Sequence, residues 1–268
     1  MIETDKKYEE LILYLRDLKN AVIAFSGGTD STFLLYSAKQ ALGDMVMAMT
    51  VKTPYIPEWE VEEAKRFCKD YAIKHRIINL AIAEEIINNP SDRCYLCKKK
   101  VFSTIISEAR KEGFTNILDG TNSDDTLDFR PGLKALNELE VKSPLLKNGL
   151  KKDEIRSLSR RFGLPTAEKP AYACLLTRLP YNYEIKNHEL ERIEKAEVYL
   201  MSLGFKVSRV RNHGNLARIE IKREDIPDFF NSGAAGKVKD YFNKIGYAYV
   251  TVDIEGYRTG SFNITIKK

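Results

Sequence analysis

A short turn rich in glycine constrains the fold of this chain more than any other feature. It follows the apolar run 21–25 and opens a helical pattern over 32–42, and it consists of Ser26, Gly27, Gly28, Thr29, Asp30 and Ser31. A strand, a tight turn and a helix in this order let backbone N–H groups surround a pyrophosphate, and the helix dipole favours its negative charge. A Walker A loop would place a lysine after the glycines, and this turn has none, so cleavage at the γ-phosphate is not expected. The alternative is a turn of the same shape that binds nothing.

Strand and helix patterns alternate through the first half of the chain. Helices are expected over 7–18, 57–71 and 94–112, and further strands over 45–51, 75–80 and 115–118. This alternation predicts an α/β fold with a doubly wound parallel sheet that binds ligands at the carboxyl ends of its strands. Gly120 and Thr121 directly follow the last of these strands, and Asp125 and Asp128 come soon after, so we expect them beside the turn. Asp30, Asp125 or Asp128 could help to hold Mg²⁺, although solvated turn residues are the alternative for the last two.

The pattern changes in the second half of the chain. Periodicity fades from Asp128, a helix is expected over 152–162, and a loop with three prolines covers 163–183. Beyond it the order is helix 188–203, strands 205–210 and 217–221, helix 225–245 and strand 247–254. We therefore expect one domain over 1–165, a cysteine-bearing loop or linker over 166–183, and a second, smaller α+β domain over 184–268.

Charge and hydropathy limit the classes of partner. The 43 Lys and Arg residues against 38 Asp and Glu give a net charge of +5, far from the basic stripe of a dedicated nucleic-acid binder. The longest apolar run, 21–25, is well short of the roughly 20 residues that a membrane span needs, and the N-terminus is not signal-like. We expect a cytoplasmic protein that acts on small phosphorylated molecules and binds neither nucleic acid nor a membrane.

Four cysteines are too few for a disulfide framework in 268 residues. Cys68 falls in a helical pattern beside Phe67 and is expected in the core. Cys94, Cys97 and Cys174 could form a three-thiolate site, which leaves one coordination position open and suits a [4Fe–4S] cluster that carries a labile sulfide. The alternatives are a redox dithiol or a partial zinc site at the first pair, with Cys174 acting alone.

Several motifs resemble those of known enzymes. The turn resembles the SGGxDS signature of PP-loop ATP pyrophosphatases, which split ATP between the α- and β-phosphates. Together with the turn, five further stretches resemble the LarE family, the sulfur transferases of nickel-pincer nucleotide synthesis, over nearly the whole chain: DRCYLCKKKVF (92–102), DGTNSDDTLDFRPG (119–132), KPAYACLLTRLPY (169–181), SRVRNHGNLARIEI (208–221) and VDIEGYRTGSFN (252–263).

The resemblance implies a PP-loop fold over 1–165 and a domain for substrate and oligomerisation over 184–268. It also implies a chemistry. ATP adenylates a carboxylate of pyridinium-3,5-biscarboxylic acid mononucleotide, AMP leaves, and a thiocarboxylate forms. One branch of the family sacrifices the sulfur of a single cysteine at the position of Cys174, whereas the other holds a [4Fe–4S] cluster with three cysteines. With Cys94 and Cys97 the chain resembles the second branch, and this resemblance implies ATP, Mg²⁺, the cluster, a sulfide donor and a homo-oligomer, either a dimer or a hexamer.

Basic residues complete the expected site. Lys98, Arg209 and Arg211 resemble the family's anion-binding residues, and Arg178 and Arg258 could also meet anions. Arg209 and Arg211 alternate on an expected strand and would share a face, although a solvated strand edge is the alternative. We expect catalytic roles for Cys174, Asp30, Lys98, Arg209 and Arg211.

Three other functions stay open. A PP-loop tRNA thiolase can use the same three-cysteine cluster, but its RNA binding should weaken steeply as salt rises. A ligase that transfers no sulfur would keep full activity without the three cysteines. A nucleotide sensor would bind ATP without releasing AMP.

Overall fold

The computed structural model describes residues 3–126 and 131–258. It divides into two compact units: Met1–Ala83 with Asp92–Tyr172, and Glu84–Ser91 with Ala173–Lys268. The short segment Glu84–Ser91 therefore belongs with the second unit, which the sequence did not indicate. The roles expected for the two domains stay predictions.

A parallel sheet of four strands forms the centre of the first unit. The strands β1 (Ala21–Ala24), β2 (Val46–Lys52), β3 (Lys74–Asn79) and β4 (Ile117–Leu118) are arranged in the order β3-β2-β1-β4. The chain builds outward from β1 to β3 and then returns to place β4 on the free side of β1. The loops after β1 and β4 thus flank the point where the winding reverses, which is where such sheets bind ligands. The expected doubly wound α/β fold is confirmed.

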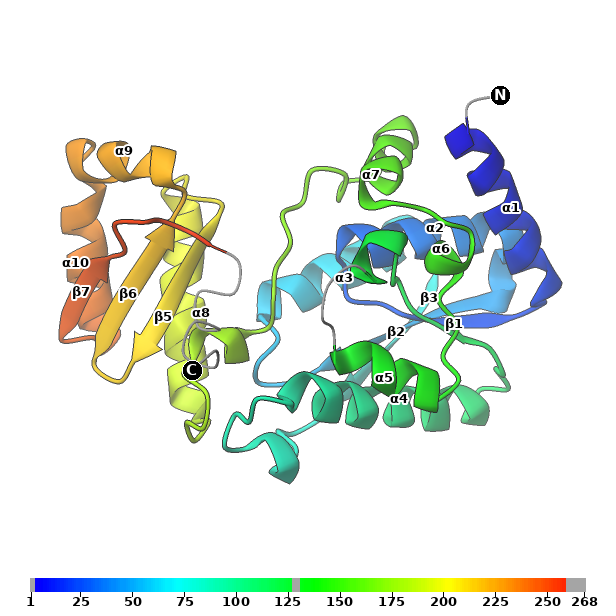
Figure 1. Cartoon of the computed structure of the whole chain (residues 1–268), viewed down its shortest axis with the longest axis horizontal. Helices are drawn as coiled ribbons and strands as arrows, with labels where there is room; N and C mark the ends of the chain where they lie inside the picture. The colour runs from blue at the N-terminus through cyan, green and yellow to red at the C-terminus, as the bar shows by residue number, and fades with distance from the viewer. Residues whose placement is uncertain (1–2, 127–130, 259–268) are drawn as a thin grey trace. The chain divides into compact units, whose positions relative to one another are not determined.

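Helices cover both faces of this sheet (Figure 1). Side chains alternate along β1, so Ala21 and Ile23 pack with one set of helices and Val22 packs with the other. The first set is α1 (Glu3–Asp17), α2 (Thr29–Leu42), α3 (Glu58–Asp70) and α7 (Lys152–Arg161), and the second is α4 (Arg93–Lys111) and α5 (Pro131–Glu138). Cys68 is buried in the first core as expected, and burial raises the pKa of its thiol to about 12. No helix within 3–126 or 131–258 has the length and apolar character needed to cross a membrane.

Helix α5 was not expected, because it falls where the sequence periodicity fades. Its Gly132 lies so close to Lys98 that an added Cβ would be 2.6 Å from Lys98 Cδ. A short helix α6 (Pro144–Lys147) follows. Both short helices precede α7 and occupy a segment that the sequence described only as rich in proline and glycine.

The second unit has its own core around a sheet of three strands. Its elements are α8 (Asn187–Ser202), β5 (Ser208–His213), β6 (Leu216–Ile221), α9 (Ile226–Asn231), α10 (Ala234–Lys244) and β7 (Tyr249–Val252). Strands β5 and β6 are antiparallel, and β7 runs parallel to β6. The prediction of one helix over 225–245 was wrong: it is broken at Gly233, whose φ of 77° lies in the left-handed region that a continuing helix cannot use.

The segment Glu84–Ser91 fastens the loop around the 3₁₀ helix η4 (Leu175–Arg178) inside the second unit. Asn89 is fully buried, and its side-chain Nδ2 donates to the carbonyl oxygens of Leu179 at 3.3 Å and Pro180 at 2.8 Å. Its φ of 49° is unusual for a residue other than glycine, although asparagine tolerates it best. The start of η4 directly follows Cys174, so Asn89 helps to fix the shape of the loop that bears this cysteine.

Candidate functional site

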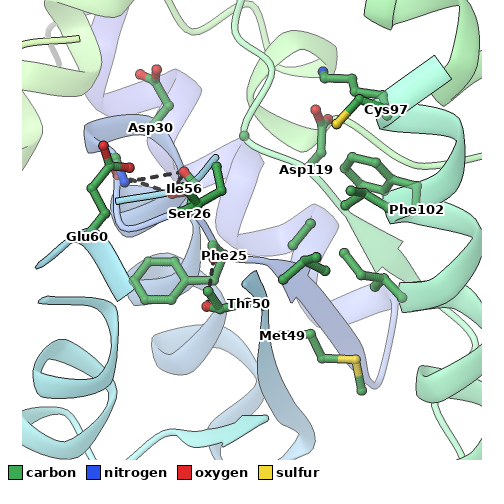
Figure 2. A pocket seen from close by; sticks show the side chains of 18 of the residues that line it. Phe25, Ser26, Asp30, Met49, Thr50, Ile56, Glu60, Cys97, Phe102 and Asp119 are labelled. Carbon is green, nitrogen blue, oxygen red and sulfur yellow. Dashed lines mark hydrogen bonds between the residues drawn. The ribbon is translucent and has the colours of Figure 1, made fainter. Parts of the chain in front are cut away.

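A cavity of about 410 Å³ opens at the carboxyl edge of the sheet in the first unit. Its floor is formed by the ends of β1 and β2, one wall by α4, and the rim by the turn after β1 and the loop after β4. Figure 2 shows Phe25, Thr50 and Met49 at the base, with Asp30 on one side and Cys97 on the other. The lining is mainly apolar with a few polar groups, as in many small-molecule pockets.

The turn after β1 is closed by its own hydroxyl groups. Ser26 Oγ lies 3.0 Å from Ser31 Oγ and accepts a hydrogen bond from the N–H of Gly28 at 3.3 Å. Gly27 has a φ of 69°, which explains the need for glycine there, and Gly28 begins α2 without a side-chain cap. The first N–H groups of α2 lie at the rim of the cavity and have no acceptor within the helix, which suits a phosphate group.

The loop after β4 touches the beginning of α2. A Cβ at Gly120 would lie 2.9 Å from the backbone N of Ser31, so only glycine allows this approach. Asp119 is buried behind it and accepts hydrogen bonds from Thr121 Oγ1 and Ser143 Oγ, each at 2.5 Å. The structure thus brings Gly120 and Thr121 beside the turn, as the strand order requires.

Asp30 and Asp125 both line the cavity. Burial raises the pKa of Asp30, Lys152 opposes this effect, and the negative charge of Asp125 adds to it. Asp30 Oδ1 is buried and has no hydrogen-bond partner among the described residues. An unpaired buried carboxylate oxygen close to a second carboxylate fits the oxygen ligands that Mg²⁺ shares with phosphates. Asp128 lies outside the described residues.

Helix α4 presents Cys97 and Lys98 to the cavity. Cys97 is partly buried, and its Sγ lies 3.2 Å from the hydroxyl of Tyr55. Burial raises the pKa of Cys97, while Tyr55 and Lys98 act in the opposite direction. Cys94 is exposed on the same helix, whereas Cys174 belongs to the second unit. Within the residues that the structure describes, no three His, Cys, Asp or Glu side chains are grouped to hold a metal ion.

A chain of hydrogen bonds runs beneath the turn. Thr50 Oγ1 donates to the carbonyl oxygen of Phe25 at 2.7 Å, and His75 Nε2 lies 2.8 Å from Thr50 Oγ1. Because the single hydroxyl proton of Thr50 goes to Phe25, the His75 ring must donate through Nε2. Burial lowers the pKa of His75 to about 4, so the neutral ring holds this chain together at physiological pH. The carbonyl of Phe25 directly precedes Ser26, so the chain fixes the base of the turn.

We expect stability to fall as the pH drops from about 6.5 toward 4, because the unfolded chain, with a histidine pKa of about 6.5, binds the proton before the folded His75 does. After discounting for partial exposure, the loss between pH 7 and pH 5 should be about 1 kcal/mol. Urea unfolding followed by the fluorescence of Trp59, the single tryptophan, measures it. A His75→Gln variant, which still can donate to Thr50, should lose this slope, whereas replacing the exposed His188 by Gln should not. Equal slopes in all three proteins would contradict the assignment.

The second unit buries an ion pair next to the cysteine-bearing loop. Arg178 Nε and Nη2 donate to the two carboxylate oxygens of Glu197 at 2.8 and 2.9 Å, and Arg178 Nη1 donates to the carbonyl oxygens of Ala173 at 2.7 Å and Cys174 at 3.1 Å. The Arg178 side chain is only 1% exposed. The structure therefore places Arg178 as a support of the loop around Cys174, a role that the sequence did not suggest.

Arg209 and Arg211 are also buried, which excludes the solvated strand edge. Arg211 donates to the carbonyl oxygen of Thr177 at 2.7 Å and to Glu220 at 2.6 Å. Arg209 lies over the ring of Tyr257 at 5.1 Å, and burial together with the nearby charge of Arg178 lowers its pKa. The second unit thus buries three arginines, Arg178, Arg209 and Arg211, together with three glutamates, Glu189, Glu197 and Glu220, and guanidinium groups of this kind suit an anion. Arg258 pairs with Glu255.

Sequence reasoning missed several of these groups. Glu197, Glu220 and His75 carry no motif and are recognised only by burial and by their partners. Lys169 lies in the motif 169–181 without a predicted role, although its Nζ donates to the carbonyl oxygen of Gly27 in the turn at 2.9 Å. A lone basic residue among prolines gives no local signal that it reaches a loop 142 positions away.

The sequence is similar to those of several known proteins. The model of the family described as queuosine biosynthesis protein QueC matches residues 20–92. The pyridinium-3,5-bisthiocarboxylic acid mononucleotide synthase of Lactiplantibacillus plantarum is 33% identical, over 98% of this chain and 95% of that one. The protein slr1717 of Synechocystis sp. is 37% identical over 98% and 99% of the two chains. A component of the glutamine-hydrolysing GMP synthase of Thermoplasma acidophilum is 30% identical over only 56% and 53%.

Proposed function

The chain belongs to the LarE family of PP-loop sulfurtransferases, and we propose that it converts a carboxylate of pyridinium-3,5-biscarboxylic acid mononucleotide into a thiocarboxylate at the expense of ATP. The observation that carries this proposal is the apolar cavity with the SGGTDS turn on its rim, in a chain similar over nearly its full length to a synthase of that product. A carboxylate is a poor electrophile until its oxygen becomes part of a good leaving group. Attack of the carboxylate oxygen on the α-phosphate releases pyrophosphate, and attack of sulfide on the adenylate then releases AMP.

The cavity can accommodate each part of ATP. Its apolar walls, among them Phe25, Met49 and Phe102, suit the adenine ring. The phosphates are proposed to bind the loop amides and hydroxyls and the loop after β4, through Ser26, Gly27, Gly28, Thr29, Ser31, Gly120 and Thr121. Asp30 and Asp125 would hold Mg²⁺, which when bound neutralises phosphate charge. Lys98 on α4 is proposed to hold the reacting anion in place.

For sulfur delivery we propose a [4Fe–4S] cluster that Cys94, Cys97 and Cys174 would hold. Three thiolates suit a [4Fe–4S] cluster, because the iron without a cysteine ligand can carry a sulfide. The donor set fits this group: Cys94 is exposed, and Cys97 and Cys174 are partly exposed. A sulfide donor would have to restore the sulfide after each turnover. Cysteines that form no disulfide are typical of a reducing compartment, in line with a cytoplasmic enzyme.

The second unit is proposed to bind the substrate's phosphate and carboxylates through Arg209 and Arg211. Both side chains are buried and are two positions apart on β5, so they share one face of the strand, which supports this role. Arg178 would act there indirectly, by holding the loop that carries Cys174. A homo-oligomer, either a dimer or a hexamer, stays a prediction of the family resemblance.

Anaerobic purification followed by iron, sulfide and AMP quantification tests the proposed function. The wild type should contain about four irons per chain and release AMP only when the dicarboxylate substrate is present. Cys94→Ala should lose the iron and repeated turnover but still bind ATP, because Cys94 is exposed and does not line the cavity. An iron-free wild type that converts one equivalent and loses the Cys174 sulfur would support the sacrificial mechanism instead. AMP release that needs tRNA, or no substrate at all, would refute the proposed reaction.

A further inference from the structure

The segment that leads toward Cys174 is attached to the phosphate-binding turn within the first unit. Lys169 Nζ donates to the carbonyl oxygen of Gly27 at 2.9 Å and to Glu63 at 2.6 Å, and it lies 5.2 Å from the centre of the Trp59 ring. Three residues further along, Tyr172 packs edge-on against the same ring, with the ring centres 4.9 Å apart. Lys169 therefore touches the turn directly, and Trp59 touches both ends of this short segment.

The backbone of the segment is held from two sides. Thr29 Oγ1, from the turn itself, donates to the carbonyl oxygen of Thr166 at 2.8 Å. Arg156 on α7 donates to the carbonyl oxygen of Lys169 at 2.7 Å and also bonds to that of Ala167. Because these hydrogen bonds hold the backbone, we expect a displacement of the turn or of Lys169 to move Tyr172 as well.

We infer that Lys169 is a positioning residue that couples occupancy of the turn by a pyrophosphate group to the placement of the chain leading to Cys174. This inference rests on the proposed function. The Lys169 side chain is 12% exposed, and its carboxylate partner Glu63 is 49% exposed, so water weakens the resting pair. A pyrophosphate at the amides of the turn brings several negative charges next to Gly27, and it competes for the same ammonium group. Lys169 then exchanges Glu63 and the Gly27 carbonyl for phosphate oxygens.

The consequence for the reaction is one of timing. Cys174 lies five residues after Lys169 in the sequence, and the chain is braced as far as Tyr172, so we expect a shift of Lys169 to change how the chain leaves the first unit. Bound nucleotide would then hold the chain that leads to Cys174 in one position, and departure of pyrophosphate would let it move. Sulfur delivery is in this way confined to molecules whose carboxylate has been activated.

Trp59, the single tryptophan, reports on this contact directly. The full-length chain is titrated with Mg²⁺ and an ATP analogue whose α,β bridge is methylene, while fluorescence and calorimetry follow the response and the binding. We expect a change in Trp59 emission in the wild type and in Lys74→Met, which removes an exposed lysine paired with Glu112. Lys169→Met should bind the analogue but lose most of the emission change, and Lys169→Arg should restore part of it. The rate at which Cys174 is alkylated in the iron-free chain, read by peptide mass, should change on adding the analogue in the wild type, Lys74→Met and Lys169→Arg. It should not change in Lys169→Met.

Glu63→Gln provides a second variant that leaves Lys169 in place. Loss of the resting partner should strengthen binding of the analogue about two- to fivefold, the ratio expected for a partly exposed ion pair. An undiminished emission and alkylation response in Lys169→Met would overturn the inference. So would a wild type that binds the analogue without any change at Trp59, and the proposed function would then still stand. A wild type that binds no nucleotide would refute both.

Discussion

Alanine in place of Gly120 should strongly weaken nucleotide binding. The added Cβ would lie 2.9 Å from the N of Ser31, 3.1 Å from its Cα and 3.2 Å from the carbonyl carbon of Asp30. These are backbone atoms in the first turn of α2, so no side chain can rotate away, and either the loop after β4 or the start of α2 must move. Overpacking of this kind costs roughly 1–3 kcal/mol of stability. Displaced amides should weaken ATP binding at least about tenfold, since each good hydrogen bond to a charged group contributes about 1.5–3 kcal/mol.

Calorimetric titration with ATP and chemical unfolding followed by circular dichroism measure the two effects. Gly236→Ala is the matched control, because nothing lies within 4 Å of an added Cβ there and the residue is inside helix α10. That variant should be unchanged or more stable by up to about 1 kcal/mol, the helix propensity difference between the two residues. Normal ATP affinity in Gly120→Ala would mean that the phosphates do not bind at the contact between these two loops.

Local patterns in the sequence were sufficient for the four strands of the first unit and for the helices between them, but not for α5 and α6. An apolar run, a glycine-bearing turn and a helical repeat specify strand, turn and helix from neighbouring residues alone, and parallel pairing then places Gly120 beside Ser31. The position of Asp125 at the cavity follows from the same rule. Elements set by one sharp local conformation were less predictable. The apolar pattern over 225–245 continues through Gly233 and predicted one helix, but the left-handed φ of Gly233 divides it into α9 and α10.

Contacts between distant segments could not be read from the sequence. Arg178, Arg209 and Arg211 were all expected to meet anions, since charge at the surface or at a ligand is the usual case. The structure distinguishes them by their partners: Glu197 and two carbonyl groups of the cysteine-bearing loop hold Arg178, whereas Arg209 contacts the Tyr257 ring and a backbone carbonyl. Only tertiary packing, which brings α8 against β5, supplies that information.

Arg178→Met should destabilise the second unit by about 3–5 kcal/mol, the usual cost of removing one partner from a buried pair. Burial would by itself raise the pKa of Glu197, but the guanidinium of Arg178 and then that of Arg209 hold it below the ordinary value. The wild-type pair therefore adds stability above the pKa of an unfolded glutamate, and this contribution is lost as the pH falls through the lower folded pKa. Without Arg178 the effect of burial should dominate, and the pKa of Glu197 should rise.

The stability gap between wild type and Arg178→Met should consequently be largest near pH 7 and narrow toward pH 5, where a folded Glu197 with a raised pKa takes up a proton. Adding Glu197→Gln removes the stranded charge and should recover part of the loss at pH 7. Arg160→Met, which breaks an exposed pair with Glu168, should have no measurable effect. Urea unfolding of the four proteins at both pH values decides the matter. If the double variant is no more stable than Arg178→Met, the cost lies in the lost carbonyl contacts to the loop of Cys174 and not in the buried charge.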